Sequence, residues 1–211
     1  VIAWPRRGGA HTRFAAEQVN EQAIRAAAWV HTSGMNLVEP PVQLATLRAM
    51  EIAHEAGVSV SIDLNLRLGK VARSLPPEYV AVIRKAIQSA DYVLGSADEE
   101  IVHLGESGDY REVSRELAGA SRVIVARLGA GGADAISSAG VVHVPAFPVQ
   151  VVDTLGAGDS FNGGFIAALM DGKPLEEALR WGNAVAALKL GRQGARGTPY
   201  RAEAEAFLAS H

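Results

Sequence analysis

The sequence predicts an α/β fold in which helices cover both faces of a mostly parallel sheet. Apolar, β-branched runs alternate with segments of helical periodicity along most of the 211 residues. Hydrophobic residues make up 48% of the chain, enough for a sizeable core in one domain. Because parallel sheets bind ligands at the carboxyl ends of their strands, the functional residues are expected just after each strand.

The first half of the chain gives three strands and two long helices. An apolar run predicts a strand at 28–32, and Pro41 then opens a helix that runs to about residue 56. Gly57 ends that helix before a second strand at 58–63. A Pro-Pro pair begins the next helix, at 76–89, and a third strand follows it at 92–94.

The second half continues the alternation and adds a hairpin. Short helices are predicted at 98–104 and 110–117, before a fourth strand at 122–126. A hairpin-like stretch pairs 135–137 with 141–144, and Val151-Val152 is interpreted as the end of another strand. Two long helices are predicted after Asp159 and after Pro174, and a last one at 202–208.

Composition excludes several classes of function. The net charge of −3 and the dispersed basic residues give no field for nucleic acid. The absence of cysteine excludes disulfides, thiolate metal sites and cysteine nucleophiles, and it is compatible with a reducing cytoplasm. No apolar run approaches the roughly 18 residues of a membrane helix. We therefore expect a cytoplasmic protein that does not bind nucleic acid or membranes.

The most informative segment is a glycine turn that leads directly into a helix. Gly156 and Gly158 allow a tight turn whose N–H groups point into one small space. Together with the helix dipole, those groups favour a phosphate or a developing oxyanion. Asp159 follows at once and is either a helix cap or a base for phosphoryl transfer to a hydroxyl. The paired glycines favour the base, because a cap does not need them.

Residues 153–161, Asp-Thr-Leu-Gly-Ala-Gly-Asp-Ser-Phe, closely resemble the second signature of the ribokinase (PfkB) family of carbohydrate kinases. The resemblance implies a three-layer α/β/α sandwich with ATP and Mg²⁺, and with Asp159 as the catalytic base. Gly156, Ala157 and Gly158 would form the anion hole, and Asp153 would help hold a monovalent cation, K⁺. A Walker A sequence is absent, so no P-loop lysine is expected.

Two further elements follow strands and extend the resemblance. Asp63, Asn65 and Arg67 are similar to a substrate-binding Asp-x-Asn-x-Arg element, in which Arg67 would suit an anionic group. A polar loop with an Asx turn is the alternative. The segment 96–100 resembles an Asn-x-x-Glu element that organises magnesium through water. Glu100 fits that element better than Glu99, and acidic residues in a first helical turn are the alternative.

The resemblance also assigns nucleotide and cation contacts. The glycine-bearing loop after the fourth strand, with Arg127, Gly129 and Gly132, would bind ATP. Asn183 would lie beside the adenine. Carbonyl groups near Gly194, with Thr198, would line the cation site. The six histidines form no metal set, and none is given a role.

The resemblance does not cover the amino-terminal portion of the family's sequence. Family members carry an amino-terminal portion with first strands, a di-glycine substrate loop and most of a β lid, and only Val1–Phe14 is interpreted as a remnant of that lid. By this resemblance, residues 15–211 would form the nucleotide-binding and catalytic domain, incomplete at its amino terminus. Either the sequence omits a segment or the protein is truncated. The intact catalytic motif favours an omitted segment.

These residues predict an ATP-dependent kinase acting on a hydroxyl of a sugar or sugar acid, such as fructose or 2-keto-3-deoxygluconate. Two alternatives stay open: a nucleoside kinase of the same family, and a truncated, non-catalytic nucleotide-binding protein. The expected partner is the small-molecule substrate, and a homodimer is left open.

Overall fold

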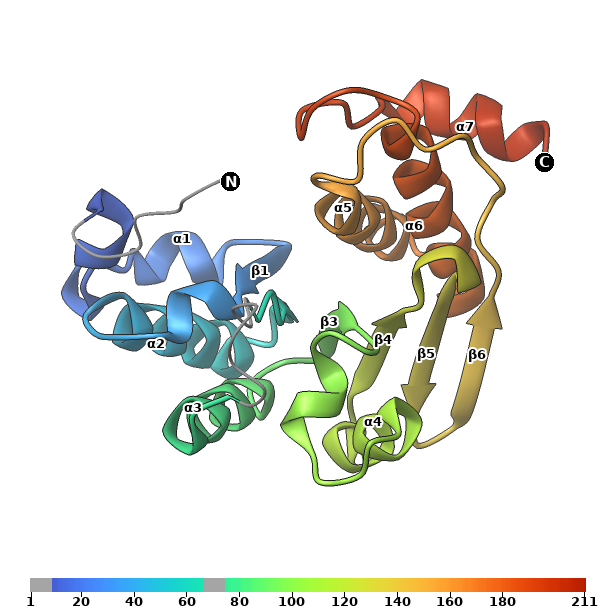
Figure 1. The fold of residues 1–211 in the computed structure, drawn as a ribbon. Helices are drawn as coiled ribbons and strands as arrows, with labels where there is room; N and C mark the ends of the chain where they lie inside the picture. Colours follow the sequence, from blue (N-terminus) through green and yellow to red (C-terminus); the bar gives the residue numbers. More distant parts are fainter. Residues whose placement is uncertain (1–8, 67–74) are drawn as a thin grey trace.

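The computed structural model of the protein describes residues 9–66 and 75–211. Within them, six strands form one sheet in the order β1-β2-β3-β4-β5-β6 (Figure 1). The first four strands run parallel, and β5 and β6 add an antiparallel hairpin. The strands are β1 (Trp29–Ser33), β2 (Ser59–Asp63), β3 (Tyr92–Ser96), β4 (Val123–Arg127), β5 (Ala133–Ser137) and β6 (Gly140–Val144). The predicted α/β class with a mostly parallel sheet is confirmed.

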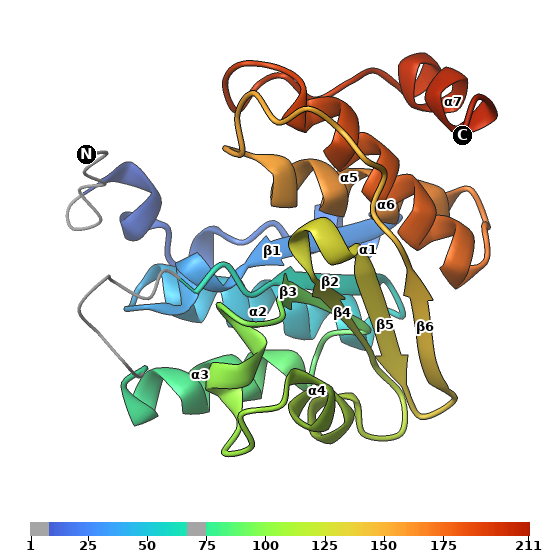
Figure 2. The same ribbon diagram turned by 45° about the vertical axis from the view of Figure 1, so that its right-hand side comes forward.

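Helices cover both faces of the sheet, as predicted. On one face lie α2, α3 and α4, and on the other α5, α6 and α7 (Figure 2). The α-helices are α1 (Glu21–Arg25), α2 (Val42–Glu55), α3 (Pro77–Ile87), α4 (Tyr110–Ala118), α5 (Ala157–Met170), α6 (Leu175–Leu190) and α7 (Arg201–Ala209). Short 3₁₀ turns occupy Ala10–Arg13, Ala16–Gln18, Gly34–Leu37, Ile101–Leu104 and Gly129–Gly131. No helix in the described ranges is long and apolar enough to cross a membrane.

Each face of the sheet has its own hydrophobic core. Val93 and Leu94 are neighbours on β3, yet Val93 packs with the α2–α4 core and Leu94 with the α5–α6 core. Ile124 and Val125 divide in the same way on β4. Successive side chains on a strand point to opposite faces, so a strand buried on both faces is a continuous apolar run. That is why the central strands could be found from sequence.

Two sequence predictions were wrong. Val151-Val152 does not end a strand: no strand covers 145–156, and both valines are more than half exposed. Pro145 and Pro148 have no N–H for a sheet ladder, and the Val152 amide instead donates to the Leu190 carbonyl at the end of α6 (2.8 Å). The helix predicted at 98–104 is only a 3₁₀ turn at Ile101–Leu104, preceded by turns.

A buried carboxylate ties α4 to the β5–β6 hairpin. Asp134 on β5 accepts hydrogen bonds from Tyr110 (2.9 Å) and Arg111 (3.1 Å) and pairs with His143 across the hairpin (2.6 Å). Burial raises the pKa of Asp134, but the hydrogen bonds outweigh it, and the pKa lies below the ordinary value of 3.8. A carboxyl with a lowered folded-state pKa stabilises the fold above its unfolded pKa and loses that contribution as the pH falls.

We therefore expect Asp134→Asn to lower the free energy of unfolding at neutral pH. The difference from wild type should shrink as the pH falls below about 3.8, toward the folded-state pKa. Urea unfolding between pH 7 and pH 3 measures this. Asp98→Asn, at an exposed position, is the matched control. A stability difference that stays constant over the whole pH range contradicts the assignment.

Candidate active site

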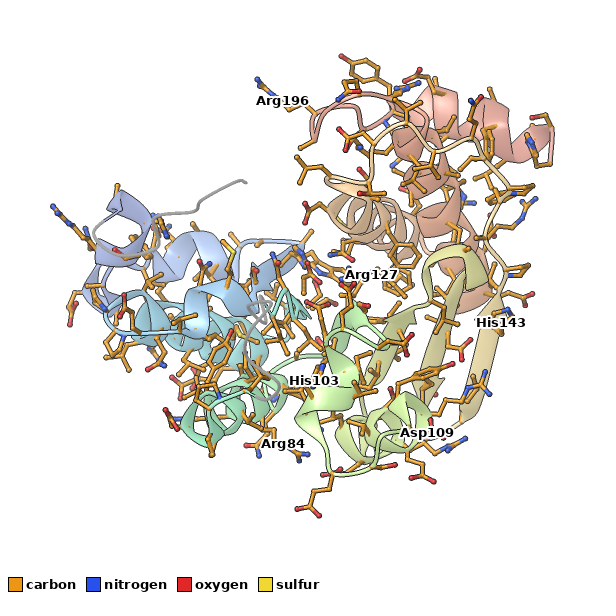
Figure 3. The ribbon with its side chains drawn as sticks, viewed as in Figure 1. Arg84, His103, Asp109, Arg127, His143 and Arg196 are labelled. Carbon is orange, nitrogen blue, oxygen red and sulfur yellow. The ribbon has the colours of Figure 1, made fainter. Side chains whose placement is uncertain are left out.

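Charged residues from three neighbouring strands meet at the carboxyl edge of the sheet. Asp63 ends β2, Glu100 follows β3, and Arg127 ends β4. The Nη2 atom of Arg127 donates to Asp63 Oδ1 (2.9 Å) and to Glu100 Oε2 (3.3 Å). Its Nη1 atom donates to Asn162 Oδ1 on α5 (2.6 Å). Figure 3 shows Arg127 at the junction between the sheet and α5, where its hydrogen bonds link the sheet to that helix.

Glu100 is held by the backbone as well as by Arg127. Its two carboxylate oxygens accept hydrogen bonds from the amides of Leu66 and Ser96, both at 2.7 Å. Burial raises the pKa of Glu100, and the amide bonds and Arg127 only partly oppose this. The neighbouring Glu99 is exposed, so Glu100 is the glutamate that the fold brings to the site.

The glycine turn positions unpaired amides at the start of α5. Gly156 has φ +83°, and a Cβ there would lie 3.0 Å from the Ala195 carbonyl, so the turn requires glycine. The Ala157 amide is already engaged by the Thr154 carbonyl (3.2 Å). In the described residues, no hydrogen bond engages the amides of Gly158 and Asp159. These two amides therefore remain as donors for an anion.

Arg127 lies directly beside this turn. A Cβ built on Gly158 would be 3.4 Å from the central guanidinium carbon of Arg127. The side chain of Arg127 is still 16% exposed, so its charge can reach an anion at the turn. The arrangement joins two amides, a helix amino terminus and a guanidinium, which is the chemistry that binds phosphate.

Asp159 is the third residue of α5, and its side chain is exposed. Gly156 is the N-cap residue, and no side-chain cap bond is formed. The carboxylate of Asp159 makes no hydrogen bond or ion pair with the described residues. The structure thus disfavours the cap interpretation and leaves the carboxylate accessible beside the two unpaired amides.

The predicted substrate element is only partly described. Asn65 adopts a left-handed backbone conformation (φ +41°), uncommon for a residue with a side chain, and its Nδ2 donates to Ser33 Oγ on β1 (3.3 Å). Asp63 is paired with Arg127, as above. Arg67 lies outside the described residues.

The predicted nucleotide loop is closely packed. Gly129 begins a 3₁₀ turn, and Gly132 has φ +94° with the Val144 carbonyl only 2.1 Å from the place of a Cβ.

Buried Asn183 on α6 donates to the carbonyls of Val144 (3.0 Å) and Pro145 (3.1 Å). Those two residues also line a hollow of about 490 Å³. Its remaining walls are His143, Ala146, Phe147, Pro174, Glu176, Glu177, Arg180 and His211.

The predicted metal residues do not converge into a cage. Among the residues that the structure describes, no three His, Asp or Glu side chains are placed to hold a metal ion together. Both oxygens of Glu100 are engaged by amides, which fits contact with Mg²⁺ through water and not direct ligation. Thr198 Oγ1 lies 2.7 Å from Ser160 Oγ on α5.

Sequence reasoning missed two side chains at this site. Asn162 is one helical turn beyond Gly158 and Asp159 and reads as an ordinary helix residue. His31 lies on β1, opposite Ser61, with Nδ1 2.7 Å from Ser61 Oγ, which also accepts from Trp29 Nε1 (2.8 Å). Burial lowers the pKa of His31, and the carboxylates of Asp63 and Asp159 partly oppose this, so the ring lies within their electrostatic range. Strand register was the signal that could have found it.

Comparison with known proteins gives a consistent result. A sequence profile of the pfkB family carbohydrate kinase matches residues 4–201. An ATP-dependent ribose-1-phosphate kinase from Halopiger xanaduensis is 35% identical over 95% of this chain and 61% of its own length. A 5-dehydro-2-deoxygluconokinase from Bacillus licheniformis is 30% identical over 93% of this chain and 61% of its own. The chain spans about three fifths of the length of these curated relatives.

Two solved structures are also similar to this chain. Aminoimidazole riboside kinase from Salmonella enterica, solved with aminoimidazole riboside and an ATP analog, has a TM-score of 0.80 and 28% identity, covering 96% of this chain and 69% of its own. An E. coli ribokinase-type protein solved with ATP and Mg²⁺ has a TM-score of 0.83 and 27% identity, covering 93% of this chain and 63% of its own.

Proposed function

Because the chain belongs to the pfkB family of carbohydrate kinases, we propose that it transfers the γ-phosphate of ATP to a hydroxyl of a sugar or sugar acid. One observation carries the proposal: the exposed Asp159 carboxylate lies next to two unpaired amides, with the Arg127 guanidinium against the same turn. A base and an anion site side by side are what phosphoryl transfer to a hydroxyl needs.

In the proposed reaction, Asp159 takes the proton of the acceptor hydroxyl as its oxygen attacks the γ-phosphorus. The new O–P bond forms while the bond from the γ-phosphorus to the bridging oxygen breaks, and ADP leaves. The amides of Gly158 and Asp159, with Arg127, stabilise the negative charge on the transferred group. Gly156 permits the turn that positions those amides. The hydrogen bond from the Ala157 amide to the Thr154 carbonyl stabilises the turn.

Magnesium would supply charge neutralisation on the phosphates, and Glu100 is the residue that would hold it through water. The loop with Gly129 and Gly132 would carry the nucleotide. Asn183 remains the proposed neighbour of the adenine, and the hollow lined by its two partners, Val144 and Pro145, supports this placement.

The acceptor is proposed to bind over Asp63, Asn65 and Arg67. The similarity to 5-dehydro-2-deoxygluconokinase and to fructokinase-1 of Oryza sativa (33% identical) supports a ketose or keto-sugar acid. A riboside is the second candidate, because aminoimidazole riboside kinase of Salmonella typhimurium is 35% identical over 87% of this chain.

A panel of acceptors tests the proposal. The intact protein is incubated with ATP, Mg²⁺ and fructose, 2-keto-3-deoxygluconate, 5-dehydro-2-deoxygluconate or ribosides, and ADP release is followed. We expect acceptor-dependent ADP release with a sugar or sugar acid. Turnover confined to ribosides favours the second candidate. ATP binding without turnover on any acceptor would mark a non-catalytic nucleotide-binding protein.

A further inference from the structure

Lys189 places a positive charge in the interior behind the glycine turn. It lies in the last turn of α6, and no part of the residue is exposed. Its Nζ atom donates to the carbonyl oxygen of Asp153 (2.7 Å) and lies 3.5 Å from that of Arg192. A buried ammonium group is costly unless oxygen atoms compensate it, so this position is built for a cation.

The oxygen atoms around Nζ are backbone carbonyls of two segments, and a carboxylate belongs to the same loop. The Asp153 carboxylate is fixed by the amides of Leu155 (2.9 Å) and Gly194 (2.7 Å). These two bonds, with a smaller effect of the Lys189 charge, hold the pKa of Asp153 below its ordinary value. The carboxyl end of α6 adds the negative end of a helix dipole. Two carbonyls thus contact the ammonium group and a helix end lies beside it, while the Asp153 carboxylate interacts with its charge without a direct contact.

We infer that the ammonium group of Lys189 supplies the single positive charge that the family resemblance assigns to K⁺. The segments that it joins, around Asp153 and around Arg192, are the ones predicted to line the cation site with Asp153, Gly194 and Thr198. The inference rests on the proposed function and refines it: turnover is independent of added monovalent cations.

The position of this charge explains how it would act on the reaction. Asp153 is three residues before Gly156, and a Cβ on Gly156 would meet the Ala195 carbonyl, so the two segments pack against each other at the turn. Thr198 reaches Ser160 in the first turns of α5. By binding both segments, Lys189 holds the turn that carries the Gly158 and Asp159 amides. It is a positioning residue and touches no substrate.

Salt substitution on the intact protein tests the inference. Turnover is measured in KCl, NaCl and choline chloride at equal ionic strength. Wild type is expected to show the same turnover in all three salts. Lys189→Ala removes the ammonium and leaves space, so turnover in choline should fall by roughly tenfold or more, with K⁺ or NH₄⁺ restoring part of it. Lys189→Met fills the space and should not respond, and Lys85→Ala, at an exposed position on α3, is the control.

Thermal unfolding provides a readout that needs no turnover. The melting temperature of wild type should not rise more in KCl than in choline chloride, whereas that of Lys189→Ala should rise specifically with K⁺, as ligand binding to the folded state requires. The melting temperatures test the role of Lys189 even if no acceptor is phosphorylated. A K⁺-specific rise in the turnover or melting temperature of wild type overturns the inference, as does wild-type turnover of Lys189→Ala in choline.

Discussion

Asp159→Asn is expected to lose turnover by about 10²–10⁴-fold, the usual contribution of a positioned general base. The amide keeps the size of the side chain but cannot take the hydroxyl proton. Because the Gly158 and Asp159 backbone amides and Arg127 are unchanged, ATP binding should be retained. Steady-state kinetics with the acceptor found in the panel, together with nucleotide titration by calorimetry, separate these two effects.

Asp171→Asn is the matched control, since Asp171 caps the other end of α5 and pairs with Arg201 at the surface. It should leave turnover unchanged. Near-wild-type turnover of Asp159→Asn would show that another group is the base. A loss of ATP binding in that variant would place Asp159 among the nucleotide contacts instead.

Arg127→Met is expected to have the largest effect on stability. It leaves the Asp63 and Glu100 carboxylates, 7% and 9% exposed, without their shared cation. Breaking a buried ion pair on one side costs about 3–5 kcal/mol, because the remaining charge stays desolvated. The pKa of Glu100, already raised by burial, should rise further. Turnover should also fall, since the guanidinium beside Gly158 is lost.

Arg127→Lys separates charge from geometry. A lysine keeps the positive charge but not the fork that reaches Asp63, Glu100 and Asn162 at once, so partial recovery of stability is expected. Arg48→Met removes a surface arginine whose side chain is 39% exposed and pairs with Glu51 and Glu21, and it should change unfolding little. Urea unfolding of the four proteins measures the order. Equal stability of Arg127→Met and Arg48→Met contradicts the assigned role.

The fold was largely predictable because its signals are local. The buried strands are continuous apolar runs, and their limits differ from the structure by one or two residues at most positions. The failure at Val151-Val152 has a physical cause. Two β-branched residues favour a strand locally, but the Val152 amide donates to the Leu190 carbonyl of α6, and the prolines upstream prevent sheet pairing.

The site was predictable only in part. The glycine turn and the residues after strands could be placed from the chain, because strand ends meet at one edge of the sheet. The pairing of Arg127 with Asp63 and Glu100 could not, since it depends on register between strands far apart in sequence. Lys189 reads as a basic residue favourable in the last turn of a helix, and only the packing of residues 153–155 and 192–194 shows that it is buried.

The contacts of Arg127 also affect how the protein unfolds. Its partners lie at positions 63, 100 and 162, in segments that are brought together only when the sheet and α5 have docked. Separating α5 from the sheet would expose the hydrophobic core between them. It would also leave a desolvated charge without its partner. The glycine turn at residues 156–158 and the central strands should therefore belong to one cooperative unit, with backbone amide exchange limited by global unfolding and not by local fraying.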